Sequence, residues 1–340
     1  MQKKLIALAV AGLVAAPAMA QSNVTIYGVA DAYFGFGSDN NNDISAINSG
    51  GLAGSRIGFK GSEDLGNGLK AVFTLEQGYA IDTGKAGPTV GDSVFSRQAW
   101  VGLQGSFGTV SLGRQYAPGY FVADYDALLS SAISPQSTLS VRNGMTITPN
   151  SPARWDNSVK YTGSFDAVKV QAIYSMGDNE LEVTDPDTGK VIGVNDDNKY
   201  GLSAAYANGP VNVGVIYHNV GGAGSDPDQK EWLIGAGYDF GMAKVVGSYQ
   251  KVSNSGNVRN LDAKLWNLGV IVPVGGGNVH LAYAKLDEDG TSVDPFSYTL
   301  AYTYPFSKRT TAYAGYQKLD YDTATKDDMD LFVVGVNHKF

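Results

Sequence analysis

Apolar and polar residues alternate with a period of two along most of this chain. In the segment 296–304, Tyr298, Leu300 and Tyr302 share one parity, while Thr299 and Thr303 share the other. A β-strand points successive side chains to opposite faces, whereas an amphipathic helix repeats every 3.6 residues. Beyond residue 20 no helical period stands out. The alternation therefore predicts an all-β protein.

The alternating segments predict about sixteen strands. They lie at 24–36, 56–63, 69–79, 96–105, 109–116, 158–164, 168–176, 199–207, 211–220, 230–240, 243–252, 264–273, 277–286, 295–304, 310–321 and 330–340.

The connections between these segments alternate between two to five residues and longer polar stretches. A secreted β-sandwich or β-helix adhesin would mix its loop lengths, whereas antiparallel transmembrane barrels have tight turns on one side and long loops on the other. Strands can cross a membrane only as a closed barrel, because lipid offers no partner for unpaired backbone groups. We therefore predict a transmembrane antiparallel β-barrel, wide enough at sixteen strands to hold an aqueous channel.

The first twenty residues have the pattern of a secretory signal peptide. Lys3 and Lys4 precede an apolar run, and Ala18 and Ala20 fit the small-residue rule for cleavage before Gln21. The alternative is a buried N-terminal helix. Cleavage would take the net charge from −8 to −10, and an acidic chain without a basic tract argues against nucleic-acid binding. The prediction is a signal peptide at 1–20 and a single barrel domain at 21–340.

One connection, residues 117–157, is much longer and more apolar than the others. Loops beyond ~12–15 residues without secondary structure are uncommon and are usually functional or disordered. We expect this third loop to fold into the lumen and narrow the pore; the alternative is an adhesive surface loop. The apolar residues that support folding inward are Tyr120, Phe121, Tyr125, Leu128, Leu129 and Ile133.

Charged residues at the narrowing should set the selectivity of such a pore. Arg56 and Lys60 share the parity opposite to Ile57 and therefore point inward. Strict alternation instead places Arg97 and Arg114 toward lipid, unless a bulge or an interfacial position intervenes. A solvated position at the rim is the alternative for each arginine. The candidate constriction residues are Arg56, Lys60, Arg97, Arg114, Asp124, Asp126, Arg142 and Arg154.

Several segments together resemble the general porins of Gram-negative bacteria, of the β-proteobacterial and neisserial type, over essentially the whole mature chain. These segments are SNVTIYGVADAYFGF, SRIGFKGSEDLGNGLKAVFTLEQGY, FSRQAWVGLQGSFGTVSLGRQY, NSVKYTG, FSKRTTAYAGY and GVNHKF.

The resemblance implies a homotrimer that lets ions and small hydrophilic solutes diffuse passively. By motif position, Arg56, Arg97 and Arg154 would form an arginine cluster facing the acidic part of the third loop. The loop reads GYFVADYDALLS here, which leaves open whether Asp124 or Asp126 meets the arginines. The lumen arginines favour a weak preference for anions.

The resemblance also implies that Phe340 belongs to the signal read by the outer-membrane assembly machinery. The last strand should pair with the first, because an unpaired edge in lipid is not tolerated. Both termini are then periplasmic. Expected partners are the assembly machinery and outer-membrane lipid or lipopolysaccharide.

Other chemistry finds little support in the sequence. His218, His280 and His338 lie on separate predicted strands and show no metal-ligand spacing. We expect no cofactor, no metal and no enzymatic activity. The alternative function is an outer-membrane adhesin that uses the barrel as an anchor and its outer loops for binding.

Overall fold

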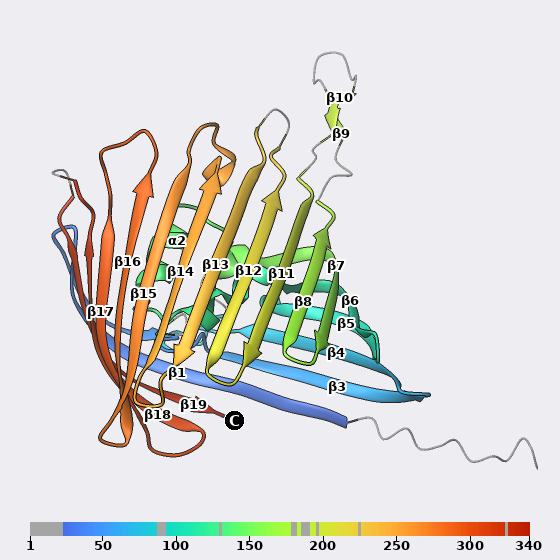
Figure 1. The fold of residues 1–340 in the computed structure, drawn as a ribbon, viewed down its shortest axis with the longest axis horizontal. Coiled ribbons are helices and arrows are strands. Elements are labelled where there is room, and N and C mark those ends of the chain that lie inside the picture. The colour runs from blue at the N-terminus through green and yellow to red at the C-terminus, as the bar shows by residue number, and fades with distance from the viewer. Residues whose placement is uncertain are drawn as a thin grey trace, which may run out of the picture.

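The structure, a computed structural model, forms a closed ring of antiparallel strands (Figure 1). It describes residues 23–86, 93–128, 131–177, 182–184, 191–194, 197–223, 226–323 and 326–340. The predicted signal peptide and Leu129 lie outside the described residues.

Sixteen strands make the ring, which confirms the predicted fold class. In ring order they are β1 (Asn23–Asp39), β3 (Arg56–Gly66), β4 (Leu69–Gly78), β5 (Gln98–Gly105), β6 (Gly108–Tyr116), β7 (Arg154–Phe165), β8 (Val168–Ser175), β11 (Lys199–Asn208), β12 (Val211–Val220), β13 (Gln229–Asp239), β14 (Lys244–Ser253), β15 (Ala263–Val274), β16 (Gly277–Glu288), β17 (Phe296–Pro305), β18 (Thr310–Asp320) and β19 (Met329–Lys339).

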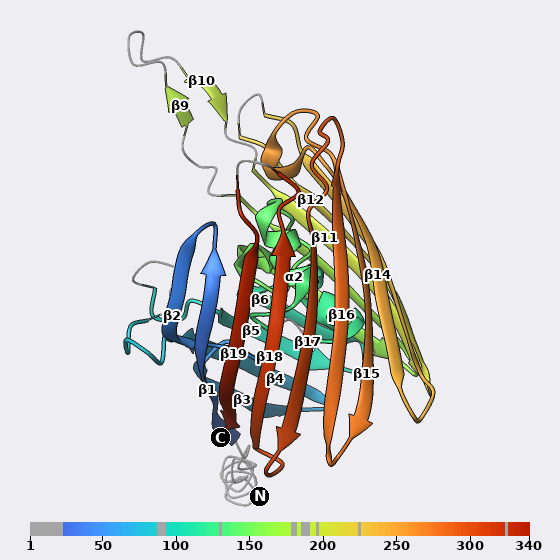
Figure 2. The same ribbon diagram turned by 90° about the vertical axis from the view of Figure 1, so that its left-hand side faces the viewer.

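The structure contains three further strands that the sequence did not predict. β2 (Asn42–Ser49) folds back on the second half of β1, whose first half pairs with β3. Asn40 and Asn41 make the turn between β1 and β2 with positive φ angles, which asparagine tolerates. β9 (Glu182–Thr184) and β10 (Val191–Val194) form a separate two-stranded sheet beyond one rim (Figures 1 and 2).

The ring closes where β19 pairs with β1. Phe340 donates its backbone N–H to Gly28 and accepts the N–H of Gly28 in return. The Phe340 ring lies so close to Gly28 that a Cβ there would come within 2.3 Å of it. The closing pair therefore places the C-terminus and the start of β1 at the same rim (Figure 2).

The two rims of the barrel differ in the length of their connections. At the rim with the termini, each connection between consecutive ring strands has two or four residues. The connections at the opposite rim are longer, as the alternation of short and long connections predicted. We call these the short-turn rim and the long-loop rim.

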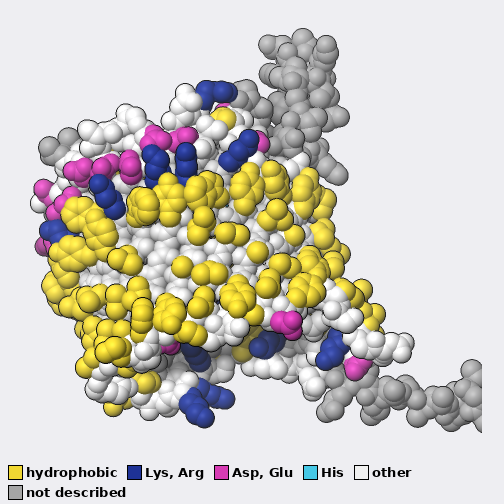
Figure 3. Space-filling view, in the orientation of Figure 1, with side chains coloured by type: hydrophobic (Ala, Val, Ile, Leu, Met, Phe, Trp, Pro, Cys, Tyr) yellow, Lys and Arg dark blue, Asp and Glu magenta, His cyan; other side chains and the backbone are white. Residues whose placement is uncertain are grey.

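Side chains alternate between a lipid-facing and a lumen-facing side. On β13, Trp232, Ile234 and Tyr238 are exposed outward, while Glu231 and Leu233 are buried inside. The outward residues form a broad hydrophobic belt around the barrel, bordered above and below by charged groups (Figure 3). Within the described residues, the helices are all too short or too polar to cross a membrane.

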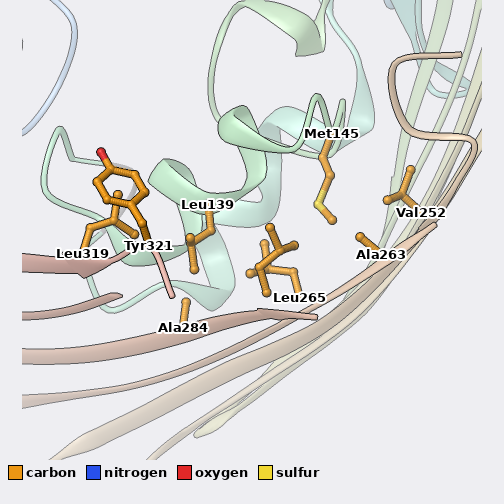
Figure 4. Packing of buried hydrophobic residues seen from close by; sticks show 9 residues of the cluster. Leu139, Met145, Val252, Ala263, Leu265, Ala284, Leu319 and Tyr321 are labelled. Atoms are coloured by element: carbon orange, nitrogen blue, oxygen red, sulfur yellow. The ribbon is translucent and has the colours of Figure 1, made fainter. Parts of the chain in front are cut away.

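The connection between β6 and β7, residues 117–153, lies inside the ring, and we call it the long loop. It contains η1 (Pro118–Tyr125), α2 (Pro135–Arg142) and η2 (Ser151–Ala153). η1 packs against β11–β14, and α2 packs against β15–β17. Leu139 and Met145 of the loop join Leu265 and Tyr321 in a buried apolar cluster (Figure 4). Burial of these side chains holds the loop against one side of the lumen.

Candidate functional site

A cavity of about 800 Å³ lies between the long loop and the opposite side of the barrel wall. None of its described lining residues carries a carboxylate. The wall contributes Arg56 and Arg97, and Arg154 borders it where the loop joins β7. The loop contributes neutral polar side chains, among them Ser131, Ser137, Thr138 and Asn150.

Arg97 is the most buried of the three arginines. Its Nε lies 2.7 Å from Oε1 of Glu76 on β4, and its side chain is only 10 % exposed. Its guanidinium also donates to the hydroxyls of Tyr116 and Tyr120. Strict alternation failed for Arg97 because β5 begins only at Gln98, so the chain before it is free to turn the side chain inward. The inward position implied by the resemblance is the observed one.

Arg56 and Arg154 are more open to the cavity. Arg56 lies 3.6 Å from Glu76, donates to the Gly54 carbonyl, and has a side chain 23 % exposed. Arg154 donates to Ser151 and lies over the rings of two tyrosines at 5.7 and 5.6 Å. These three arginines and Glu76 form what we call the arginine cluster. Three guanidinium groups against one carboxylate leave an excess of positive charge.

Glu76 was missed as a site residue, although it organises the cluster. It accepts hydrogen bonds from Tyr27 and Tyr116 as well as from Arg97. Its shared parity with Lys70 and Thr74 on the polar side of the strand was the available signal.

Tyr116 and Tyr120 stack with their ring centroids 3.7 Å apart and thereby join the wall to the start of the long loop. Burial raises the pKa of Tyr120, but Arg97, Arg154 and Arg56 outweigh it and the net shift is downward. The direction of this shift reflects the positive potential of the cluster.

Lys60 and Arg142 lie away from the cavity. Lys60 faces the lumen nearer the short-turn rim and lies 5.1 Å from the ring centre of Tyr27. Arg142 ends α2 and lies 4.6 Å from the ring centre of Tyr321. Neither lines the cavity with the arginine cluster.

Arg114 does not line the cavity, and its mostly buried side chain donates to the Ser96 carbonyl. It shares the outward parity of Leu112, which is 54 % exposed, while Gln115 is buried inside. Its guanidinium pairs with Asp156 at 2.6 Å, and the Asp156 side chain is two-thirds exposed. Strict alternation was therefore correct for Arg114, and its assignment to the constriction finds no support in its position.

The two loop acids also lie away from the arginines. Asp126 is buried within the loop, where it accepts the N–H of Leu128 and the hydroxyl of Ser134. Asp124 is exposed, and Lys169 and Lys244 are the charged groups that act on it. Partial desolvation by the surrounding protein nevertheless raises the pKa of Asp124, against the opposing effect of those lysines. Neither acid lines the cavity.

A second polar cluster, which we call the loop anchor, holds the long loop to the far wall. Glu231 on β13 is fully buried and accepts the backbone N–H groups of Thr146 and Ile147 at 2.8 and 2.9 Å. Gln250 on β14 donates to Glu231 and to the Ile147 carbonyl. His218 on β12 accepts the N–H of Gly119 at 2.9 Å. The anchor therefore ties three wall strands to both ends of the loop.

Asp31 on β1 fixes the wall segment across the cavity. Its buried carboxylate accepts the N–H groups of Gly51, Leu52 and Ala53, the hydroxyl of Tyr313 and the amide of Asn337. The Gly51 carbonyl then accepts the N–H of Ala132 in the long loop. A Cβ at Gly51 would meet the Tyr313 hydroxyl at 1.8 Å, so this close approach requires glycine.

The described residues contain no group of three or more histidine, cysteine, aspartate or glutamate side chains placed to hold a metal ion.

Comparisons with known proteins agree with this architecture. The family model for Gram-negative porins matches residues 7–324. Outer membrane porin protein 32 of Delftia acidovorans is 33 % identical over 327 residues, which cover 92 % of this chain and 88 % of the relative. An outer membrane porin protein of Bordetella pertussis is 29 % identical over the full length of both chains.

Among solved structures, an anion-selective porin from Comamonas acidovorans superposes with a TM-score of 0.80 at 26 % identity, covering 94 % of this chain and 100 % of that one. The family match, the relatives and the sixteen-stranded ring agree. The chain therefore belongs to the Gram-negative porin family, the channel-forming β-barrels of the outer membrane.

Proposed function

We propose that this porin lets small hydrophilic solutes and ions diffuse passively, with a weak preference for anions. One observation carries the proposal: the cavity beside the long loop is lined by three arginines and by no carboxylate among its described residues. The relative from Comamonas acidovorans, which is described as anion-selective, supports it.

The arginine cluster would act on a passing ion through its field and not through tight binding. Low-dielectric walls focus the field of lumen charges on the narrow part of a pore. Arg56 and Arg154 are the open members that an anion could approach, while Arg97 is mostly buried and bonded to Glu76 and two tyrosines. Glu76 offsets part of the positive charge, and the opposite loop surface is neutral. A modest selectivity follows from this balance.

Four further proposals concern assembly and rest on membership of the family. The chain is made with a cleaved signal peptide at residues 1–20. It forms a homotrimer with both termini in the periplasm. Phe340 serves as part of the signal for the assembly machinery. Outer-membrane lipid or lipopolysaccharide surrounds the trimer.

The test is the zero-current potential of purified protein in a planar bilayer under a salt gradient. We expect stepwise conductance in groups of three and a potential of the sign that anion movement produces. Folded protein that gives no conductance would overturn the channel, and a potential of cationic sign would overturn the selectivity. Liposome swelling with small sugars separates this function from an adhesin, whose lumen would exclude them.

A further inference from the structure

Three lysines point into the lumen around the start of the long loop. Lys160 on β7 is only 8 % exposed, and Lys169 on β8 shares the inward parity of the buried Gln171. Lys244 is the first residue of β14 and shares the inward parity of the buried Val246. None of the three lines the cavity beside the arginine cluster. We call these three lysines the lysine site.

The ring of Phe121, which lies in η1, brings two of these lysines together. Nζ of Lys160 lies 5.3 Å from the ring centre, and Nζ of Lys169 lies 4.6 Å from it. The two ammonium groups are therefore within one Debye length of each other, which is ~10 Å at 0.1 M salt. η1 also packs against both β8 and β14, the strands that carry Lys169 and Lys244. The three lysines thus surround one short segment of the long loop.

Positive charge at the lysine site is incompletely balanced. Asp124, also in η1, is close enough to Lys169 and Lys244 for both to act on its charge. In the part of the chain that the structure describes, none of the three lysines forms an ion pair. Lys160 donates to the Tyr116 carbonyl at 2.7 Å, and this acceptor is neutral. Three ammonium groups against one carboxylate leave the same excess of positive charge as in the arginine cluster.

Aromatic rings connect the lysine site to the arginine cluster. Arg154 of the cluster lies 5.6 Å from the ring centre of Tyr120. Tyr120 and Phe121 are neighbours in η1, and their ring centroids are 6.1 Å apart. Tyr116, which stacks on Tyr120, also accepts the hydrogen bond from Lys160. The two basic sites are therefore contiguous along one side of the lumen.

The lysine site extends from the arginine cluster toward the short-turn rim. β8 and β14 both begin at that rim, and Lys169 and Lys244 are among the first two residues of their strands. Arg154 is instead the first residue of β7, which runs away from the long loop toward the short-turn rim. An ion that leaves the arginine cluster toward the short-turn rim therefore meets the lysine site next.

We propose that the lysine site is a second site for small inorganic anions and carboxylates in transit through the pore. The inference rests on the proposed function for the direction of selectivity, and it extends the path of the anion from the cavity to the short-turn rim. Lumen charges act through a field that low-dielectric walls focus. Conduction is favoured by several weak sites in sequence, because an ion must be able to leave each one. Asp124 keeps the second site weak by offsetting part of its charge.

Cysteine labelling measures the potential at the lysine site directly, because the chain contains no cysteine. Ser164→Cys introduces one thiol opposite Lys169 in the β7–β8 register, at a position with the lumen parity of Lys160. The experiment compares the rates at which an anionic and a cationic methanethiosulfonate reagent label this thiol in detergent-purified, folded protein. Adding K169Q/K244Q should lower the anionic-to-cationic rate ratio by roughly threefold at 0.1 M salt and by little at 1 M salt, where the lysines are screened.

Two further variants separate the charge of the lysine site from general effects on labelling. K308Q/R309Q removes two positive charges from the exposed turn between β17 and β18, at the same rim, and should leave the rate ratio unchanged. K169R/K244R keeps the charge and should also leave it unchanged. An unchanged ratio in K169Q/K244Q, or an equal fall in K308Q/R309Q, would overturn the lysine site.

Zero-current potentials of K169Q/K244Q without the added cysteine test the role in transport. At low salt we expect a shift toward the cationic side, smaller than the shift that the loss of Arg56 and Arg154 produces. A lowered labelling ratio without any shift would overturn the role in transport. Wild-type protein that fails to conduct, or that prefers cations, would count against the proposed function. The labelling ratio needs no current, so it decides the lysine site independently of that result.

Discussion

The arginine cluster and the loop anchor are both polar groups inside the same barrel, on opposite sides of the long loop. In the anchor, Glu231 and His218 are fully buried, and the loop backbone itself supplies their hydrogen-bond partners. In the cluster, Arg56 and Arg154 remain partly exposed to a cavity. One region uses polar groups to hold the loop, and the other presents them to whatever passes it.

Comparison of the loop anchor with the arginine cluster shows that a charged side chain inside a barrel is not by itself evidence of a role in transport. The discriminating features are exposure to the cavity and the fraction of donors and acceptors already used within the protein. Arg97 is informative because it belongs to the cluster by position and resembles the anchor by burial.

The largest expected effect is the loss of the anchor. Glu231→Leu would leave the N–H groups of Thr146 and Ile147 and the amide of Gln250 without their acceptor. A buried donor left without an acceptor costs about 1–3 kcal/mol, so we expect a loss of roughly 3–5 kcal/mol in the free energy of unfolding. Equilibrium urea unfolding in detergent measures it. Glu231→Gln should lose less, and a leucine variant as stable as the wild type would contradict the anchor's role.

The next largest effect tests whether Arg97 has a structural role, like the anchor residues, or is an open arginine like Arg56 and Arg154. Arg97→Met leaves Glu76 as a nearly buried carboxylate without its closest partner, which should cost about 3 kcal/mol of stability. Adding Glu76→Gln to this variant should recover much of the loss, as a double-mutant cycle would show. If the two changes were simply additive, Arg97 would belong with the open arginines instead.

A smaller effect concerns selectivity. Arg56→Ser combined with Arg154→Ser should move the zero-current potential toward the cationic side with little change in stability. A unit charge about 4 Å from an ion is worth ~1 kcal/mol in water, so each arginine should change relative anion permeability by roughly fivefold at most. Arg114→Ser is the matched control, because it removes the same charge from a position that does not line the cavity. An equal shift in the control would remove the distinction between the arginines that line the cavity and those that do not.

The smallest effect should come from Asp124, which faces Lys169 and Lys244 and not the arginines. The pKa of Asp124 in the folded protein lies above the ordinary 3.8, so its charged form destabilises the folded state. This destabilisation is fully present above the folded pKa and disappears as the pH falls below 3.8. Protonation in that window should make the pore slightly more anion-selective. Zero-current potentials at pH 7 and near pH 4 should therefore change slightly less in Asp124→Asn than in the wild type. A large difference in zero-current potential between Asp124→Asn and the wild type at pH 7 would place Asp124 in the constriction.

The barrel was predictable because its determinant is local and repeated. Every lipid-crossing strand must show one apolar face, so a period of two and the rhythm of connections suffice. β2 was missed because its NDISAINS sequence is mostly exposed and pairs only with half of β1, so no lipid-facing stripe marks it.

The arginine cluster was only partly predictable, because parity fails where a strand has not yet begun. Arg97 precedes β5 by one residue, so alternation carried no information about it. Arg114, within β6, obeyed alternation and does not line the cavity. The expectation that a loop acid would face the arginines was wrong for another reason. Asp126 accepts hydrogen bonds from the loop's own backbone and from Ser134, and these contacts depend on the tertiary fold of the loop.

The pairing of β1 with β19 determines when the barrel can close during synthesis and folding of the chain. Partners such as Val29 and Lys339 are about 300 residues apart in sequence, so the ring cannot begin to close until almost the whole chain has been synthesised. Contacts of such separation form slowly, because the long intervening loop must first be brought together. Until that moment the partly built sheet has two open edges, each able to pair with another chain. A chain of this topology therefore exposes edges that can pair with another chain for longer than a chain whose edge strands are neighbours in sequence.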